Sequence, residues 1–492
     1  MEIIKKNIIN LEKYGHRPGK KKKIDVEKYI YTIKASNSIG VNHEKELPEE
    51  YLKEVKDFLK KEHKSLLQES FGDEKKKTAL RKVVSQYLIE KPNLPGFSLD
   101  ELTKLLVDAV AGLDVLESIA ENPNVTDIIC NEFDEVWVTD LKEGKYRSNI
   151  QFKNRAAYET LCYKFAYASG QTWSYSKPEC DAFFPNLRIN LMGFDISQDG
   201  ISLAVRKFTK GMRINRKSIL ETNHATETML DLLRAIVRTR SRILISGSTG
   251  AGKTELLKYL VGDIHELDRI LMIQDNPEVF LKYIYPDRDI KTWITREREG
   301  IENGIDIDRL NRSALRQFIK WLIIGESRGG GDAWGMVKAA KTGHPVITTL
   351  HSFGAIDSIE RVVDMCSEKV NMSLESLYRS VANNFDFGIH LEQTLDGTRR
   401  ITEIVEYTGY KDGEVQYNKL FSFDIESEIE YEDEKGRTRF KVEGYHKQEG
   451  YLSDFRIKEM KKARVFTKRL EVLQEDREKA DLTKGGAAVA VS

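Results

Sequence analysis

A glycine-rich stretch near the middle of the chain has the composition of a loop that holds nucleotide phosphates. It reads Gly247-Ser248-Thr249-Gly250-Ala251-Gly252-Lys253-Thr254. In such a loop the glycines let successive backbone N–H groups turn toward the phosphates, the lysine reaches the terminal phosphates, and the last hydroxyl is placed to coordinate Mg²⁺. Lys253 and Thr254 occupy these two positions, so the sequence predicts that the chain binds ATP together with Mg²⁺.

The segments on either side of this loop support the same interpretation. Ile243-Leu244-Ile245 is a short apolar run that is typical of a buried parallel strand, and Thr254 to Leu260 has the apolar spacing of an amphipathic helix. Strand, loop and helix in this order are what a phosphate-binding loop requires. A glycine-rich turn without a ligand is the alternative, and the flanking segments make it the weaker one.

Polar residues follow three other apolar runs of the chain. Leu322–Ile324 runs into Gly325-Glu326-Ser327-Arg328, Val346–Leu350 runs into His351, and Ile270–Ile273 runs into Gln274-Asp275-Asn276-Pro277-Glu278. The runs alternate with helical patterns, as in a doubly wound α/β domain, whose ligand crevice lies outside the carboxyl ends of its strands. A carboxylate there can orient or deprotonate an attacking water, and an imidazole can sense a phosphate through a hydrogen bond.

Composition limits the class of protein. At 492 residues, with 40% hydrophobic and 32% charged residues, the chain is long enough for two or three folded domains. Lysine plus arginine and aspartate plus glutamate both number 78, which gives no strong nucleic-acid signal. No apolar run approaches the roughly twenty residues of a membrane span or resembles a signal peptide, so we expect a cytoplasmic protein. The four cysteines stand far apart, which favours reduced, structural thiols over a metal site.

Charge and hydrophobic patterns predict the order of the domains. The predicted segments are 1–45, a basic extension or tether; 46–110, a helical bundle; 111–210, an α+β domain; 211–222, a linker; 223–425, the nucleotide-binding domain; and 426–492, a C-terminal extension that ends in a flexible tail. The basic run Lys20–Lys23 is expected to be a solvated linker, and contact with anionic lipid is the alternative.

Four stretches resemble, in order and spacing, the motifs of the type II/IV secretion ATPase superfamily. They are Gly247–Thr254 for Walker A, Ile273–Glu278 for the Asp box, Leu315–Arg328 for Walker B and Thr342–Ser352 for the His box. The variety that they resemble most is the group of tight-adherence pilus ATPases with its archaeal and conjugative relatives. The similarity extends from about Leu113 to Tyr407 and includes a late hairpin at Asp396-Gly397-Thr398-Arg399-Arg400.

The resemblance implies a fold and an activity. The fold would be α/β, with a RecA-like P-loop NTPase core, a smaller α+β N-terminal domain and an N-terminal helical region. The activity would be Mg²⁺-dependent ATP hydrolysis by a homo-oligomer, expected to be a hexamer. Such a ring would lie at the cytoplasmic face of the membrane and work with an integral membrane platform protein of a secretion, pilus or conjugation machine.

The resemblance also implies roles for single residues. Glu326 would be the catalytic base and His351 the phosphate sensor. Arg312 and Arg316 match the arginine-rich helix that precedes Walker B, and Arg188 and Arg206 are candidates to reach the nucleotide from the N-terminal domain. Arginines that neutralise transition-state charge raise rates by about 10³- to 10⁵-fold. As alternatives, Arg312 and Arg316 could line a solvated helix face, and His351 could be a core histidine with satisfied hydrogen bonds.

The Asp box departs from the family pattern at its first position. Gln274 stands where a glutamate is usual, followed by Asp275 and Glu278, so one negative charge that would help hold Mg²⁺ or the attacking water is missing. This favours, as a second hypothesis, a nucleotide-binding assembly scaffold with weak hydrolysis. A third hypothesis, a DNA-translocating motor of similar core fold, is made weaker by the zero net charge.

Overall fold

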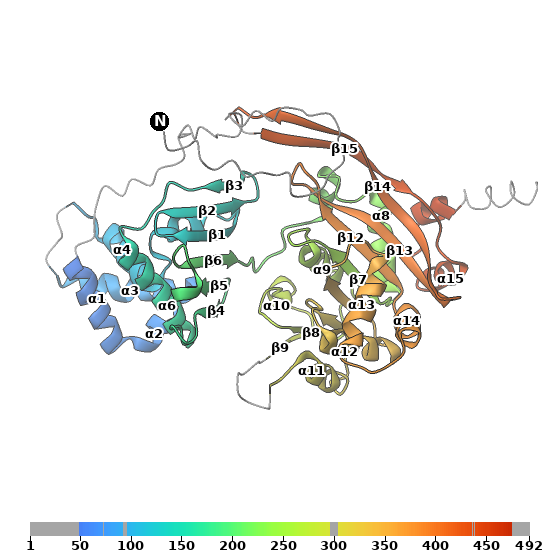
Figure 1. The fold of residues 1–492 in the computed structure, drawn as a ribbon, viewed down its shortest axis with the longest axis horizontal. Helices are drawn as coiled ribbons and strands as arrows, with labels where there is room; N and C mark the ends of the chain where they lie inside the picture. Colours follow the sequence, from blue (N-terminus) through green and yellow to red (C-terminus); the bar gives the residue numbers. More distant parts are fainter. Residues whose placement is uncertain are drawn as a thin grey trace, which may run out of the picture. The chain divides into compact units, whose positions relative to one another are not determined.

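The computed structural model describes residues 49–71, 73–91, 96–295, 304–434, 436 and 438–474, which contain two β-sheets and the helices packed on them (Figure 1). The predicted basic extension and the glycine- and alanine-rich tail lie outside the described residues. Among the described residues, no helix is both long and apolar enough to cross a membrane. All four cysteines are buried and form no disulfide.

Four helices open the described chain. They are α1 (Glu49–Glu62), α2 (Lys64–Glu69), α3 (Glu74–Ile89) and α4 (Leu99–Ala111). Asp73 caps α3 by accepting two backbone N–H groups, and Ser98 with Glu101 forms a capping box at the start of α4. Their apolar stripes meet in one small core that includes Leu59, Leu80 and Leu106.

The first sheet is antiparallel and has six strands in the order β3-β2-β1-β6-β5-β4. The strands are β1 (Val125–Glu132), β2 (Glu135–Asp140), β3 (Gly144–Arg147), β4 (Glu179–Phe184), β5 (Leu187–Met192) and β6 (Ser202–Lys207). Buried and exposed residues alternate along them, because one face packs on α6 (Arg155–Ser169) and its neighbours. This sheet is the smaller α+β domain that precedes the nucleotide-binding core.

The second sheet has nine strands in the order β15-β14-β13-β12-β7-β11-β10-β8-β9. Its parallel part consists of β12 (Phe387–Gln393), β7 (Ile243–Gly247), β11 (Val346–Leu350), β10 (Trp321–Ile324), β8 (Ile270–Gln274) and β9 (Ile290–Ile294). Four of these strands coincide with the apolar runs predicted from the sequence. Every residue of β7, β8, β10 and β11 is buried, as expected for parallel strands covered on both faces.

Two separate cores explain why these strands are apolar throughout. On β7, Ile243 and Ile245 belong to one core and Leu244 to the other, since successive side chains of a strand point to opposite faces. The first core also contains α8 (Glu227–Arg238) and α9 (Lys253–Val261). The second core contains α12 (Gly330–Lys341), α13 (Asp357–Ser367) and α14 (Leu374–Ala382). The doubly wound, RecA-like fold predicted from the sequence is confirmed.

Three antiparallel strands extend this sheet beyond β12. They are β13 (Arg399–Lys411), β14 (Glu414–Glu432) and β15 (Thr438–Gln448), followed by α15 (Asp454–Lys462). The boundary predicted at residue 425 falls inside β14, because strand pairing continues without a change of composition that would mark the position. The predicted linker at 211–222 contains a short helix, α7 (Arg216–Glu221), which Asn215 caps.

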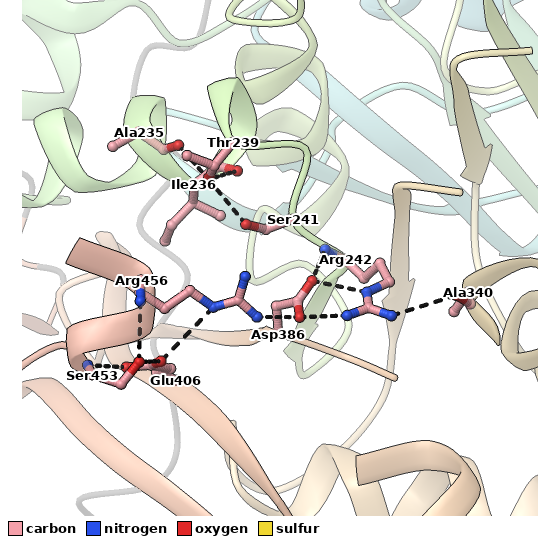
Figure 2. A network of polar contacts seen from close by, with 10 residues as sticks. All are labelled: Ala235, Ile236, Thr239, Ser241, Arg242, Ala340, Asp386, Glu406, Ser453 and Arg456. Carbon is pink, nitrogen blue, oxygen red and sulfur yellow. Dashed lines mark hydrogen bonds and ion pairs between the residues drawn. The ribbon is translucent and has the colours of Figure 1, made fainter. Parts of the chain in front are cut away.

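A buried polar network fixes α15 to the sheet (Figure 2). Asp386, just before β12, accepts hydrogen bonds from the backbone and guanidinium of Arg242, at 2.7 to 2.9 Å, and also from Arg456 of α15. Glu406 of β13 accepts from Ser453, at 2.8 Å from its N–H and 2.5 Å from its hydroxyl. Asp386 and Glu406 are only 3% and 2% exposed, so the C-terminal helix is an integral part of this domain.

Candidate nucleotide site

The Gly247–Thr254 loop connects β7 to α9, and its glycines have conformations that other residues rarely adopt. Gly247, Gly250 and Gly252 have φ angles of 148°, 83° and 99°. At Gly247 a Cβ would also lie 2.2 Å from the carbonyl oxygen of Leu391, on the neighbouring strand β12. The loop therefore has the backbone geometry that the sequence predicts for a phosphate cradle at a helix N-terminus.

Lys253 is held inside this loop although it carries a charge. Its Nζ donates to the carbonyl oxygens of Gly247 and Ser248, at 2.7 and 2.9 Å, and lies 3.3 Å from Nδ1 of His351. Burial lowers the pKa of Lys253 to about 8. At neutral pH most of the population is still protonated, and that is the form that attracts phosphate oxygens.

Glu326 follows β10, and its carboxylate lies between the side chains of His351 and Arg328. Its Oε1 is 2.9 Å from Nε2 of His351, and its Oε2 accepts from Nη2 of Arg328 at 2.7 Å. Burial would raise the pKa of Glu326, but the hydrogen bond and charge of Arg328 outweigh burial, so the pKa lies below its usual value. Glu326 is therefore ionised at neutral pH, as a group that orients or deprotonates water must be.

Contacts between Thr349 of β11 and the residues that follow β10 fix the position of this carboxylate. Thr349 of β11 donates its hydroxyl to the carbonyl of Gly325 at 2.7 Å, and its own carbonyl accepts from the N–H of Ser327 at 2.8 Å. Because β7, β11 and β10 are adjacent in the sheet, their carboxyl ends bring together Lys253, His351 and Glu326. The structure thus assembles three of the residues singled out from the sequence into one chain of contacts.

The Asp box lies at the end of β8, and its polar side chains have internal partners. The amide oxygen of Gln274 accepts from the backbone N–H groups of Glu278 and Val279, both at 3.3 Å. The carboxylate of Asp275 accepts from the hydroxyl of Thr295 at 2.9 Å, and burial raises the pKa of Glu278. Gln274 is 5% exposed, so its amide shapes the turn between residues 274 and 279.

The arginines before Walker B are not both helical. The helix α11 (Ile307–Ala314) contains Arg312, whereas Arg316 lies in the turn that follows, so the expectation that one helix carries both is wrong. The helix ends early because the chain must turn back into β10, and Phe318 in this turn has a φ of 53°. Arg312 is 68% exposed and lies 3.6 Å from Asp308. Within the described residues, neither arginine contacts the Lys253–His351–Glu326 cluster.

The two arginines of the N-terminal domain are neighbours in its sheet. Arg188 of β5 and Arg206 of β6 are directly paired, so their side chains share one face. Nε of Arg206 donates to Asp127 at 2.7 Å. A contact of either arginine with the nucleotide stays a prediction.

The loop and its surroundings fit a nucleoside triphosphate with Mg²⁺. The glycine cradle leaves the space and backbone freedom that phosphates need, and Thr254 in the first turn of α9 carries the hydroxyl that would hold the metal. The described residues include no cluster of three or more His, Cys, Asp and Glu side chains that could hold a metal ion. Mg²⁺ bound through one protein ligand and the substrate phosphates needs no such cluster.

Sequence reasoning assigned no role to three residues near the loop. Arg328 pairs with Glu326. The sequence held a signal for this pair, because Arg328 is a cation two positions after Glu326, and residues i and i+2 of an extended segment share a face. His390 of β12 is buried with its Nδ1 2.8 Å from the hydroxyl of Ser246, and its signal was a lone polar residue in an apolar run. Arg399 donates to the carbonyl of Gly250 across a large sequence distance, for which the sequence carries no local signal.

Comparison with known proteins finds similarity over the part of the chain that carries this geometry. Residues 186–411 match the family model described as Type II/IV secretion system protein. An uncharacterized protein of Bacillus anthracis is 28% identical over 371 residues, which are 73% of this chain and 82% of the relative. A putative conjugal transfer protein of Mycobacterium tuberculosis is 23% identical, over 61% of this chain and 86% of the relative. The type IV secretion system protein VirB11 of Brucella suis is 26% identical, over 59% of this chain and 88% of the relative.

The matched residues begin at β5 of the N-terminal domain and run to the end of β13, so they include the phosphate loop, the Asp box, Glu326 and His351. The motifs, their order along the chain and the fold that carries them agree. The matched segment, residues 186–411, is similar to the type II/IV secretion system proteins.

Proposed function

We propose that the chain is an ATP-hydrolysing motor that works as a ring in a secretion, pilus or conjugation machine. The observation that carries the proposal is the chain of contacts from Lys253 through His351 to Glu326 and Arg328. It joins the phosphate loop to an ionised carboxylate and a second cation at the carboxyl ends of neighbouring strands. A site that only bound nucleotide would need no carboxylate held in this position.

The residues suggest how hydrolysis proceeds. A water oriented by Glu326 attacks the γ-phosphorus in line, and the bond between that phosphorus and the bridging oxygen to the β-phosphate breaks as ADP leaves. Lys253 and Arg328 neutralise charge that spreads over the phosphoryl oxygens in the transition state. His351 bridges Lys253 and Glu326, so it can report the presence of the γ-phosphate to both. Mg²⁺ bound at Thr254 would supply further charge neutralisation.

The four candidate arginines could complete the site of a neighbouring subunit in an assembly. Arg312 and Arg316 face solvent, and Arg188 and Arg206 belong to the separate N-terminal domain. We propose that arginines from this set complete the site in a hexamer, and that rotation of the domains about residues 211–222 converts the nucleotide state into movement. The ring would sit at the cytoplasmic face of the membrane on an integral platform protein.

Phosphate release from Mg-ATP by the purified chain tests the catalytic part of the proposal. Lys253→Ala and Glu326→Gln should each abolish turnover, whereas Arg379→Ala should not, because Arg379 is an exposed arginine of α14 that pairs with Glu375. Turnover that survives in both site variants would refute the assignment. A chain that stays monomeric with an ATP analogue at every concentration would refute the ring.

The nucleotide-binding scaffold is the second candidate, and Gln274 is the observation that favours it. A carboxylate would keep the acceptor for the N–H groups of Glu278 and Val279 and would add a negative charge near the site. If the missing charge limits hydrolysis, Gln274→Glu should raise turnover at least about tenfold, in line with the effect of a positioned base. If turnover of Gln274→Glu stays within threefold of that of the unmodified chain, the missing charge does not limit hydrolysis, and the motor is favoured over the scaffold.

A further inference from the structure

Arg399 lies against the outside of the phosphate loop. It is the first residue of β13, and its Nε donates a hydrogen bond of 2.7 Å to the carbonyl oxygen of Gly250. Its aliphatic carbons pack on Gly252, where a Cβ would lie only 3.1 Å from Cδ of the arginine. One side chain therefore contacts two of the loop glycines, through a charged donor and through its methylene groups.

The peptide group that Arg399 contacts is part of the cradle. The carbonyl of Gly250 shares its peptide bond with the N–H of Ala251, and this N–H donates to the carbonyl of Ser248 at 3.3 Å, which closes a turn inside the loop. A charge-assisted hydrogen bond to the carbonyl fixes the plane of this peptide and polarises it, which strengthens its N–H as a donor. Arg399 thus supports the Ser248–Ala251 turn of the loop from outside.

The hairpin that carries Arg399 is itself well anchored. Arg399 pairs with Gln393 across β12 and β13, and its carbonyl lies 2.7 Å from Nδ1 of the buried His224. In the connecting turn, Asp396 accepts hydrogen bonds from Thr394, Thr398 and Arg400. The same hairpin approaches the loop at its start, where the carbonyl of Leu391 closes the space beside Gly247. The anchored hairpin therefore contacts the loop at two places, beside Gly247 and at Gly250.

We propose that Arg399 is a positioning residue that holds the phosphate loop in its binding conformation through the carbonyl of Gly250. The proposal rests on the proposed function, since it assigns phosphate binding to this loop. In this proposal Arg399 contacts the loop and makes no contact with the base or ribose of the nucleotide. Losing the guanidinium should therefore weaken the binding of any polyphosphate, with or without a nucleoside.

Binding of Mg-ATP and of Mg-tripolyphosphate to the full chain, measured by calorimetry, tests this proposal. Arg399→Met keeps the methylene groups against Gly252 and removes the donor, and it should weaken binding of both ligands by about tenfold, the usual effect of losing a hydrogen bond from a charged group. Arg399→Lys restores a cationic donor and should recover affinity to within about threefold. Arg379→Met, an equivalent change at an exposed arginine, should leave both affinities unchanged.

The outcomes separate the possible roles of Arg399. Unchanged affinities in Arg399→Met, or a loss for ATP with none for tripolyphosphate, would overturn the proposal, because the second result means a direct contact with the nucleoside. Arg399→Met could instead lower the thermal midpoint of unfolding while both affinities stay unchanged at temperatures where the chain is folded. If Arg399→Lys did not restore the midpoint, Arg399 would have a purely structural role, and the proposal would again be overturned. If the unmodified chain binds neither ligand, the proposed function fails, whereas normal binding without an effect of Arg399 refutes only this inference.

Discussion

The two ends of the parallel strands in the nine-stranded sheet carry polar clusters of opposite character. At the carboxyl ends, Lys253, His351, Glu326 and Arg328 share hydrogen bonds, and His351 and Arg328 remain about half exposed, at 45% and 48%. At the amino ends, the network around Asp386 is buried and its carboxylate binds two guanidinium groups and a backbone N–H (Figure 2).

Under the proposed function, this difference separates a polar cluster that acts on a ligand from one that holds the fold. A buried carboxylate with all its acceptor sites used has no capacity left for a substrate, but removing it leaves buried cations without a partner. A partly exposed cluster contributes little to stability, because water replaces its contacts, yet its groups are open to a ligand. Each cluster should therefore respond to mutation in only one of the two measurements, stability or activity.

The largest expected effect is the loss of activity in Glu326→Gln. The amide cannot act as a base and no longer pairs with Arg328 as a charge, so we expect kcat for ATP hydrolysis to fall about 10³-fold. The free energy of unfolding in urea should change by less than about 1 kcal/mol, since the pair is partly exposed. A variant that loses stability along with activity would break the distinction between the two clusters.

Asp386→Ala should do the reverse. It leaves the guanidinium groups of Arg242 and Arg456, whose side chains are 24% and 13% exposed, without their carboxylate, and this costs about 3 kcal/mol of unfolding free energy. This is the low end of the usual range, because Arg456 keeps Glu406 at 3.8 Å and Arg242 keeps the carbonyl of Ala340 at 3.4 Å. Urea unfolding measures the loss, and the ATP affinity of the fraction that is still folded should be unchanged. A fall in that affinity would mean that the two ends of the sheet are coupled.

A smaller effect follows from the lowered pKa of Lys253. The protonated form attracts phosphate, so nucleotide affinity should be constant at neutral pH and fall as the pH rises through about 8, by up to tenfold per pH unit. For folding the sign is opposite, since the folded chain favours the neutral amine, and stability rises over the same pH interval. Binding of Mg-ATP between pH 7 and 9.5 measures the first effect. An affinity that stays flat to pH 9.5 would contradict this assignment.

The smallest effect is expected for the exposed pair of Arg379 and Glu375 on α14. Glu375→Ala removes a solvent-screened ion pair at helix spacing, so the free energy of unfolding should change by about 0.3 to 0.5 kcal/mol and hydrolysis should not change. This variant sets the baseline for the other three. A loss above about 1 kcal/mol would show that exposed pairs in this domain are not negligible.

The sequence allowed a good prediction of the strand ends that carry the candidate site. Short apolar runs followed by Glu326 and His351 locate strand ends, and parallel strands bring their carboxyl ends together whatever the connecting segments are. The role of Gln274 was not predictable, because whether its amide faces the site or caps a turn depends on a side-chain direction that spacing does not determine. The contact of Arg399 with Gly250 was equally hidden, since it joins residues 149 positions apart.

The C-terminal extension was predicted as a segment, but its attachment to the sheet was not, for a related reason. Asp386, Glu406 and Arg456 are ordinary charged residues in the sequence, and only the folded sheet shows that they meet in a buried network. Charged residues are usually exposed, so a sequence-based reading assigns them to the surface. The strands β14 and β15, which extend the sheet, lie entirely beyond the residues that the family model matches, and no motif marked them.

The four buried cysteines have a practical consequence for testing the proposed domain movement. A thiol reacts as its thiolate, and burial raises the pKa of both Cys130 and Cys366 to about 12. Burial also raises the pKa of Cys162 and Cys180, so the native thiols are shielded and largely protonated at neutral pH. A single cysteine introduced on an exposed position of either sheet would then be the preferred target of a maleimide dye, without prior removal of the native four. Domain rotation during ATP turnover could be recorded by fluorescence on the otherwise unmodified chain.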